Sequence, residues 1–325
     1  MTGGRERPPA PARERPAGAA RATRGGVGKP LWLRVRLPRA APFRATAALL
    51  DDLELHTVCE AARCPNRGEC FGAGTATFLV LGETCTRACG FCSIGRAPSR
   101  WVPPDADEPR RVARAAARLG LSHVVVTSVT RDDLDDGGAV HYAATIAALY
   151  DELPEATIEV LVPDFGGDPA ALAVVLAARP RVLGHNLETV PRLYGEVRPA
   201  ASYRRSLDLL RAAAAGGADS VLVKSGLMLG LGETADEVAG VLADCAAAGV
   251  GLVTVGQYLR PVAGCLPVTR YVPPDEFAAL VPLGARLGLR VEAGPFVRSS
   301  YHAAASLAAG GRAEADRSGN GAQTS

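Results

Sequence analysis

The sequence predicts an α/β protein folded as a partial (β/α)6 barrel of the TIM type. Six short segments are almost continuously apolar, which is typical of parallel strands buried on both faces. Amphipathic helical stretches alternate with them, and this alternation implies right-handed crossovers in either a barrel or an open doubly wound sheet. Six such units are fewer than the eight of a closed barrel, so a partial barrel is the preferred geometry.

The expected elements follow in regular order. Strands are expected at 77–82, 123–128, 157–162, 181–186, 220–225 and 251–258. Helices are expected between them at 108–119, 138–152, 169–178, 202–215 and 234–248. Two helix starts have clear signals: Asp168 is an N-cap followed by Pro169 at the first helical position, and Thr234 with Glu237 makes a capping box.

The two ends of the chain differ from its middle. Residues 1–28 are rich in Arg, Ala, Gly and Pro, and residues 310–325 are polar and glycine-rich, so both are expected to be disordered tails. An organelle transit peptide is the alternative for the first tail, but Glu6, Glu14 and the scarcity of Ser disfavour it. Between the tails we expect an N-terminal extension (29–76), the barrel (77–290) and a C-terminal segment (291–309).

Composition excludes several classes of protein. The 325 residues carry a net charge of +2, which is too small to indicate nucleic-acid, membrane or acidic partners. The longest uncharged run, 245–259, is shorter than the roughly 20 apolar residues of a spanning helix. No apolar segment follows the basic N-terminus, so a cytoplasmic location is expected and an organelle matrix is less favoured. Six of the eight cysteines lie between Cys59 and Cys92, which indicates a metal site rather than a disulfide scaffold.

The densest cysteine pattern is the downstream triad, Cys85, Cys89 and Cys92, spaced CxxxCxxC directly after the first expected strand. A barrel places its active-site loops at that end of its strands. A 4Fe-4S cluster normally takes four thiolates, so three leave one iron open to a substrate atom. Half of a zinc site, or a redox pair made from the CxxC part, is the plainer alternative. The complete spacing after a strand favours the cluster.

The upstream triad is Cys59, Cys64 and Cys70, spaced CxxxxCxxxxxC. A structural zinc knot is its plainer alternative. However, no histidine stands at zinc-finger spacing, and a tetrahedral zinc would still need a fourth ligand.

With these motifs the chain resembles the lipoyl synthases of the radical S-adenosylmethionine superfamily. In that family both triads occur with a C-terminal Arg-Ser-Ser-Tyr segment, here Arg298 to Tyr301 followed by His302. Alone, Ser299-Ser300 would be an ordinary polar turn. The similarity begins at Lys29, and its other matched segments are 127–129, 131–134, 136–139, 163–165, 185–188, 190–192, 224–228, 230–234, 256–259 and 294–296.

The resemblance implies two 4Fe-4S clusters and S-adenosylmethionine as cofactors. The downstream triad would hold the radical cluster, whose open iron chelates the amino and carboxylate groups of S-adenosylmethionine, with Phe91 as the usual aromatic neighbour. The upstream triad and Ser300 would hold an auxiliary cluster carried by the extensions on either side of the barrel.

Polar residues are expected to gather around the cofactor. Six stand at or just after the carboxyl ends of successive expected strands: Cys85, Thr127, Asp164, Asn186, Lys224 and Gln257. Groups placed there converge on one pocket, although any one of them could be only a solvated cap.

The resemblance distributes cofactor contacts among these and neighbouring residues. Thr127 and Ser128 are expected to face the methionine amino group, and Asn186 and Glu188 are candidates for the ribose and methionine ends. The expected cofactor-binding set also includes Lys224 and three residues of a glycine-spaced stretch similar to the superfamily's adenine-binding strand, Gly226, Gly230 and Glu233.

The reaction implied is that of a sulfurtransferase, which inserts two sulfur atoms at C6 and C8 of an octanoyl chain linked to a lysine. Saturated carbon has no acidic proton, so side-chain acid–base catalysis cannot break its C–H bonds and a cofactor must carry that step. The sulfur would come from the auxiliary cluster, which makes its four ligands catalytic: Cys59, Cys64, Cys70 and Ser300. We also hypothesise that a serine oxygen leaves more readily than a thiolate as the cluster is consumed.

The resemblance also implies partners. They are the octanoylated lipoyl carrier domains of 2-oxoacid dehydrogenase E2 subunits and the glycine cleavage H protein, an electron donor such as ferredoxin or flavodoxin, and an iron–sulfur carrier that renews the cluster. No nucleic-acid or membrane partner is expected.

Three rival functions stay open at this stage: a methylthiotransferase, a non-enzymatic iron–sulfur electron carrier and a zinc-stabilised interaction protein. The sequence departs from the family pattern at Thr130, at 93–98 and at 263–265, which puts substrate contacts in doubt. Cys245 is expected to be a buried helix thiol and Cys265 an incidental loop thiol, since neither fits a cluster spacing.

Overall fold

The main sheet of the computed structural model has eight strands in the order β1-β2-β5-β6-β7-β8-β9-β10. The structure describes residues 29–34, 40–96, 101–217, 221–300 and 303. Strand β1 is antiparallel to β2, and every other neighbouring pair is parallel. The parallel strands follow chain order without a reversal, as in a barrel and unlike a doubly wound sheet. The expected α/β partial barrel is confirmed.

The bounds of the expected elements agree with the structure to within two residues, except that β8 runs four residues past its expected end. The strands are β1 (His56–Thr57), β2 (Thr77–Val80), β5 (His123–Ser128), β6 (Thr157–Leu161), β7 (Val182–Gly184), β8 (Leu222–Leu229), β9 (Leu252–Gln257) and β10 (Arg290–Gly294), with a separate pair β3 (Thr84–Cys85) and β4 (Gly95–Arg96). The α-helices are α1 (Ala40–Asp52), α2 (Val58–Ala61), α3 (Arg67–Gly72), α4 (Glu108–Arg118), α5 (Ala139–Glu152), α6 (Pro169–Ala177), α7 (Tyr194–Val197), α8 (Tyr203–Gly217), α9 (Ala235–Ala247) and α10 (Pro274–Arg286). Three short 3-10 helices are η1 (Leu31–Leu33), η2 (Phe165–Gly167) and η3 (Pro191–Leu193).

Both expected helix caps are confirmed. The Asp168 side chain accepts a hydrogen bond from the backbone N–H of Ala170 at the start of α6. Thr234 and Glu237 form the reciprocal capping box of α9. These local bonds fix where the two helices leave the carboxyl side of the sheet.

Within the described residues, the main sheet has one parallel strand more than the six expected. Helix α10 and strand β10 extend the barrel, and β10 pairs with β9 from Arg290 to Gly294. The sequence signal was weak because Val291 is the only buried residue of β10 and Pro282 lies inside α10. The range expected for the C-terminal segment, 291–309, therefore begins inside the sheet.

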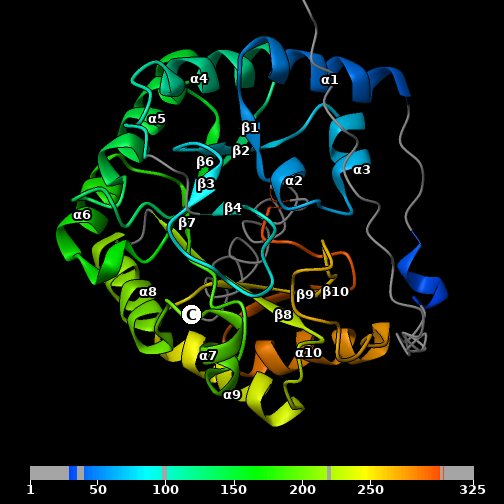
Figure 1. Cartoon of the computed structure of the whole chain (residues 1–325). Helices are drawn as coiled ribbons and strands as arrows, with labels where there is room; N and C mark the ends of the chain where they lie inside the picture. Colours follow the sequence, from blue (N-terminus) through cyan, green and yellow to red (C-terminus); the bar gives the residue numbers. More distant parts are fainter. Residues whose placement is uncertain (1–28, 35–39, 97–100, 218–220, 301–302, 304–325) are drawn as a thin grey trace, which may run out of the picture.

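In Figure 1 the helices from α4 to α10 form an outer ring around the strands, and α1 and α3 continue that ring on the N-terminal side. Helix α1 packs on α3, where Phe43 and Phe71 stack with ring centroids 5.5 Å apart. No helix in the described part of the chain is long and apolar enough to cross a membrane. The tails 1–28 and 310–325, Tyr301 and His302 lie outside the described residues.

Candidate active site

The downstream triad lies in a loop that leaves the carboxyl end of β2. Leu81 and Gly82 both adopt left-handed backbone angles, φ 68° and φ 90°, and turn the chain sharply after the strand. The buried carboxylate of Glu108 accepts the backbone N–H of Leu81 at 2.9 Å and a ring N–H of His141 at 2.7 Å. The pairing of β3 with β4 then closes the base of the loop that carries the three thiols.

Arg87 anchors this loop to the barrel. Its guanidinium donates to Asp132 at 2.9 and 2.7 Å and to Asp164 at 2.6 Å. Asp164 also accepts from Arg205 at 2.8 Å and is fully buried. Burial alone would raise the pKa of Asp164, but the two arginines hold that pKa well below its ordinary range. Two matched segments of the sequence, 131–134 and 163–165, therefore act here by fixing the cysteine loop.

Gly90 is enclosed within the loop. Its N–H donates to the carbonyl of Val197 at 2.8 Å, and its own carbonyl accepts from Leu266 N at 2.8 Å. A Cβ on Gly90 would lie 2.8 Å from Leu266 Cδ1 and 3.0 Å from the carbonyl oxygen of Glu196. The backbone between the last two cysteines is thus held from two sides, where only glycine fits without displacement.

The thiols of the downstream triad lie close enough together for their charges to interact. Burial is the main cause that raises the pKa of Cys92 to about 12, and the nearby Cys89 and Cys85 contribute to that rise. Burial also raises the pKa of Cys89, whereas the guanidinium of Arg198 lowers it. Thiolates are the iron ligands, so loading this site with metal would release protons.

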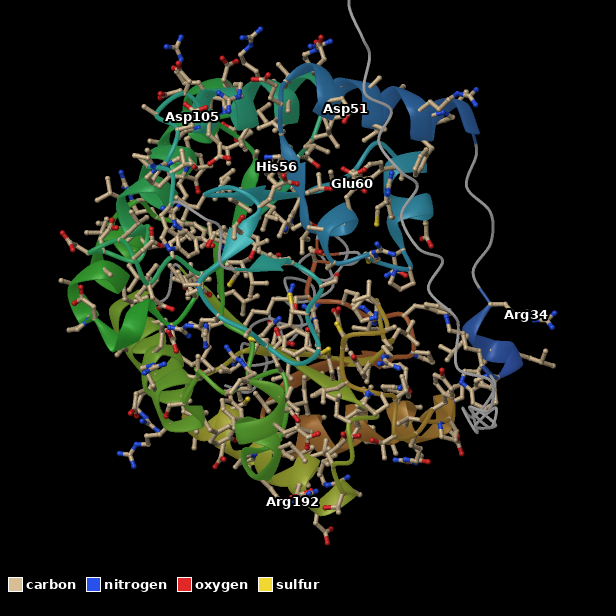
Figure 2. All side chains as sticks on the ribbon, in the orientation of Figure 1. Arg34, Asp51, His56, Glu60, Asp105 and Arg192 are labelled. Atoms are coloured by element: carbon tan, nitrogen blue, oxygen red, sulfur yellow. The ribbon has the colours of Figure 1, made fainter. Side chains whose placement is uncertain are left out.

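The upstream triad is positioned by short helices of the N-terminal extension. Thr57 caps α2, which carries Cys59, and α3 carries Cys70. Arg67 pairs with Glu60 at 2.9 Å and lies over the rings of Phe43 and Phe71. Figure 2 labels Glu60, a residue of α2, inside the ring of helices. These contacts tie α2 to α3 and fix the spacing of the outer two cysteines.

All three upstream cysteines and Ser300 line one cavity of about 230 Å³, which we call the triad cavity. Burial raises the pKa of Cys59 to about 11 and that of Cys70 to about 12. In the described part of the chain, no three His, Cys, Asp or Glu side chains lie close enough to hold a single metal ion. Three soft thiols with one hydroxyl around a cavity suit an iron–sulfur cluster.

A second cavity of about 240 Å³, the central cavity, lies at the carboxyl ends of the barrel strands. Its wall includes Cys92 of the downstream triad together with Asn186 and Glu188. It meets the triad cavity along six residues that line both: Cys59, Cys64, Thr77, Val125, Arg298 and Ser300. A reactive group in the central cavity would thus face two upstream cysteines and Ser300.

Comparison with known proteins agrees with this geometry. The chain matches the Radical SAM superfamily model over residues 79–245. It is 58% identical over 275 residues to the lipoyl synthase of Nitratidesulfovibrio vulgaris (strain DP4), covering 84% of this chain and 91% of that protein. The lipoyl synthase of Trichlorobacter lovleyi is 58% identical over 277 residues, which are 85% of this chain and 97% of the relative.

The chain belongs to the lipoyl synthase family. The resemblance seen in the sequence is confirmed, and with it S-adenosylmethionine and 4Fe-4S clusters as the cofactors of the family. Among solved structures, methylornithine synthase (PylB) shares the fold with a TM-score of 0.51 and 18% identity, over 76% of this chain and 74% of that one. The hydrogenase maturase HydG from Carboxydothermus hydrogenoformans has a TM-score of 0.52 at 16% identity, over 77% of this chain and 65% of that one.

Within this family member, Asn186 and Glu188 form the polar centre of the central cavity. Asn186 Nδ2 donates to Glu188 Oε1 at 2.9 Å. Glu188 has a left-handed backbone angle, φ 67°, and forms a parallel bridge with Leu227. Burial raises the pKa of Glu188, and Arg198, Asn186 and Arg298 oppose that rise. The Glu188 side chain thus has one amide donor and two nearby positive charges, and it lies close to the downstream triad.

Arg198 is a site residue that the sequence analysis missed. It is buried, and its Nη1 donates to the carbonyl of Asn186 at 2.7 Å and to that of Leu187 at 3.3 Å. Its charge acts on both Cys89 and Glu188. No motif spacing marks it, because it follows α7 in a loop whose path only the fold reveals.

The other expected cofactor contacts lie in different places. Thr127 lines the central cavity, but the next residue, Ser128, lines neither cavity because neighbouring strand residues point to opposite faces. Gly226 also lines the central cavity, whereas Gly230 and Glu233 line neither. The Glu233 carboxylate instead accepts the backbone N–H groups of Gly230 at 2.6 Å and Leu231 at 2.9 Å, and so shapes the glycine turn.

Lys224 does not stand at the end of its strand as expected. Strand β8 continues to Leu229, so Lys224 is its third residue and its side chain lies deeper in the barrel. It lines neither cavity. Gln257 does end β9 and lines the central cavity, but its amide donates to the carbonyls of Leu229, Tyr258 and Arg270.

The departures from the family pattern make defined contacts. Thr130 accepts the N–H of Thr86 through its backbone carbonyl at 3.0 Å, so this contact with the cysteine loop is independent of its side chain. Ser93 Oγ donates to the carbonyl of Ala61 at 2.8 Å and links the cysteine loop to α2. Cys245 is fully buried in α9 as expected. Cys265, which was expected to be an incidental loop thiol, is buried too, and its Sγ lies 3.4 Å from the carbonyl oxygen of Cys92.

Proposed function

We propose that this chain is a lipoyl synthase that inserts two sulfur atoms at C6 and C8 of a protein-bound octanoyl-lysine. Family membership supports the reaction class. The observation that carries the proposal is the shared wall of the two cavities, where Cys59, Cys64 and Ser300 border the space that Cys92 and Glu188 also line. A radical formed in that space would meet the sulfur source without leaving the barrel.

The residues that would hold the inorganic groups follow from this arrangement. The downstream triad would hold the radical cluster, and the upstream triad with Ser300 would hold the auxiliary cluster. When bound, the first supplies the electron that cleaves S-adenosylmethionine and the second supplies sulfur. The division of the chain into an N-terminal extension, a barrel and a C-terminal segment is part of this proposal.

The polar side of the central cavity would bind S-adenosylmethionine. Asn186 and Glu188 offer an amide and a carboxylate to its amino and hydroxyl groups, and Arg198 fixes the backbone carbonyl of Asn186. Thr127 donates its hydroxyl to the carbonyl of Leu161 at 2.9 Å, so it can still accept a bond from a ligand N–H. Gly226 lets the Asn186 side chain lie directly against β8, because a Cβ there would lie 2.6 Å from Asn186 Oδ1.

The apolar side of the same cavity suits a saturated acyl chain. Val58, Phe91, Met228, Leu259 and Pro261 line it. An octanoyl chain would gain about 0.8 kcal/mol for each methylene it buries there. Exclusion of water by these side chains would also protect a carbon radical from side reactions.

The proposed function also involves three kinds of partner protein. Octanoylated carrier domains would present the acyl-lysine, a ferredoxin or flavodoxin would supply electrons, and an iron–sulfur carrier would renew the auxiliary cluster. We also propose a cytoplasmic location. The proposed reaction itself needs only one macromolecular substrate, the carrier domain or a peptide that contains its lysine.

Anaerobic reconstitution tests the proposed function. Iron and sulfide are counted per chain, and the protein is then incubated with S-adenosylmethionine, a low-potential reductant and an octanoyl-lysyl peptide. Two bound clusters and a peptide product with two added sulfur atoms are expected by mass spectrometry. A chain that binds a single cluster, or that cleaves S-adenosylmethionine and leaves the peptide unchanged, would contradict the proposal.

A further inference from the structure

A buried charged pair crosses the interior of the barrel. Lys224 Nζ lies 2.8 Å from Glu159 Oε1, and the two side chains are 4% and 3% exposed. His123 Nε2 lies 3.0 Å from the other oxygen of the same carboxylate. Burial raises the pKa of Glu159, but His123 and Lys224 lower it by more, so the carboxylate stays ionised. Barrel interiors are normally filled by branched aliphatic side chains, and buried ion pairs rarely add stability over them.

The ammonium of Lys224 has a second partner far along the chain. It donates to the backbone carbonyl of Ser299 at 2.5 Å, a contact between residues 75 positions apart. Ser299 directly precedes Ser300, whose side chain lines both cavities. The charged pair therefore ends on the backbone that carries the expected fourth ligand of the auxiliary cluster.

The barrel wall leaves room for this backbone at two glycines. A Cβ on Gly226 would lie 2.8 Å from Ser299 Oγ, and a Cβ on Gly256 would collide with the carbonyl oxygen of Val297. Both glycines line the central cavity on neighbouring strands, β8 and β9. Segment 295–300 therefore lies directly against the inner face of the sheet.

Two further hydrogen bonds hold the same segment. Asn66, which lies between Cys64 and Cys70, donates to the carbonyl of Phe296 at 2.8 Å. Ser299 Oγ donates to Asn186 Oδ1 at 3.0 Å. The segment is thus attached to the upstream triad on one side and to the central cavity on the other, and Lys224 supplies its only charged donor among these contacts.

We propose that Lys224, held by Glu159 and His123, is a positioning residue that fixes the backbone of Ser299 and so directs Ser300 toward the upstream triad. The inference rests on the proposed function, because it concerns the auxiliary cluster. It replaces the cofactor-binding role expected for Lys224. A charge-assisted hydrogen bond to a carbonyl is stronger than a neutral one, and Glu159 lies 2.8 Å from the ammonium that donates it.

The test isolates the auxiliary site. A parent chain carries Cys85→Ala, Cys89→Ala and Cys92→Ala, so that iron binds only at the upstream triad. After anaerobic reconstitution it is expected to hold about four irons. The measurement is the rate at which a chelator removes this iron, for the parent and for variants at Lys224.

Lys224→Met in this parent is expected to lose iron about tenfold faster, which corresponds to the loss of one charge-assisted hydrogen bond. Because this variant leaves the buried Glu159 carboxylate without its ammonium partner and could misfold, Lys224→Met is also combined with Glu159→Gln, which leaves a neutral pair. The double variant is expected to lose iron as fast as the single one, and Lys224→Arg to restore most of the parental rate. In the full chain, Lys224→Met is expected to leave the S-adenosylmethionine dissociation constant unchanged.

Three results would overturn the inference. A double variant as slow as the parent would mean that Lys224 only balances the charge of Glu159. An unchanged iron-release rate with a raised S-adenosylmethionine dissociation constant would return Lys224 to the cofactor site. A parent that binds no iron would remove the proposed auxiliary cluster itself. Arg192→Gln is the matched surface control, because Arg192 projects from the outer rim in Figure 2 and its partner is Glu237.

Discussion

Asn186 Oδ1 accepts a hydrogen bond from Ser299 Oγ at 3.0 Å, so the loop that follows β7 touches the residue that precedes Ser300. The amide nitrogen of Asn186 donates at the same time to Glu188. One side chain therefore connects the proposed S-adenosylmethionine contacts with the segment that carries the proposed cluster ligand.

Asn186→Ala is expected to affect both sites. Loss of the bond to the Glu188 carboxylate is expected to raise the S-adenosylmethionine dissociation constant about tenfold. Loss of the bond from Ser299 is expected to speed iron release from the auxiliary site. Equilibrium dialysis and chelator kinetics measure the two effects separately.

Two further variants separate the effect on S-adenosylmethionine binding from the effect on iron release. Glu188→Gln is expected to weaken S-adenosylmethionine binding alone, and Ser299→Ala to speed iron release alone. If Asn186→Ala binds S-adenosylmethionine as tightly as the unmodified chain, Asn186 and Glu188 do not contact it.

Cys64→Ala is expected to separate the two halves of the reaction. Cys64 lines both cavities, while the downstream triad lies in a different loop. The variant is expected to cleave S-adenosylmethionine under reductant and to form no sulfur-containing product. Liquid chromatography of 5′-deoxyadenosine measures the cleavage, and mass spectrometry of the peptide measures the insertion of sulfur.

Cys245→Ala is the matched control for the removal of a thiol. Cys245 is fully buried in α9 and borders neither cavity, so its loss is expected to cost about 1 kcal/mol of stability and no chemistry. Normal yields of lipoyl product from Cys64→Ala would show that sulfur comes from elsewhere.

Asp164→Asn is expected to loosen the loop of the downstream triad. It leaves Arg87 and Arg205 without a buried anionic partner, which costs about 3 kcal/mol. The pKa of Asp164 is lowered in the folded chain, so its contribution is present above its ordinary pKa of about 4 and is lost as pH falls below that value. Urea unfolding of the iron-free chain measures it.

The stability difference between the unmodified chain and Asp164→Asn is therefore expected to be constant from pH 7 to about pH 5 and to shrink in more acidic buffer. Arg192→Gln, which breaks a surface pair with Glu237, is expected to leave stability almost unchanged, because solvent screens such pairs. A difference that grows on acidification would contradict the ion-pair explanation.

Sequence patterns predicted the elements of this fold well, because buried parallel strands and capped helices have local signals. They predicted less about the tasks of single residues. Asp164 was expected at a strand end, yet its partner Arg87 lies 77 positions away and only the fold brings them together. Lys224 was expected at a strand end because the strand expected at 220–225 stops there, whereas β8 continues to Leu229.

The candidate site shows the same limit. Cysteine spacing and the serine segment indicated which ligands to expect, since iron–sulfur ligands carry strong sequence signals. The shared wall of the cavities and the role of Arg198 depend on contacts between distant loops. Such contacts leave no periodicity that a single sequence could reveal.

Gly256→Ala is expected to displace the C-terminal segment from the barrel. A Cβ at this position would collide with the carbonyl oxygen of Val297 and would lie 2.9 Å from Arg298 Nη1. Strand β9 cannot move away, because Gly256 is paired with Met228 on one side and Gly294 on the other. The backbone of Gly256 lies outside the left-handed region, so the effect is steric and not torsional.

The overpacking is expected to cost about 1–3 kcal/mol and to speed iron release from the auxiliary site more than from the downstream triad. The matched control is Gly240→Ala in α9, where a new Cβ meets nothing within 4 Å. That substitution is expected to stabilise the chain by about 0.5–1 kcal/mol, because alanine favours a helix over glycine. If both variants retain auxiliary iron equally well, the segment that carries Ser300 is not held by the inner face of β9, and the steric argument fails.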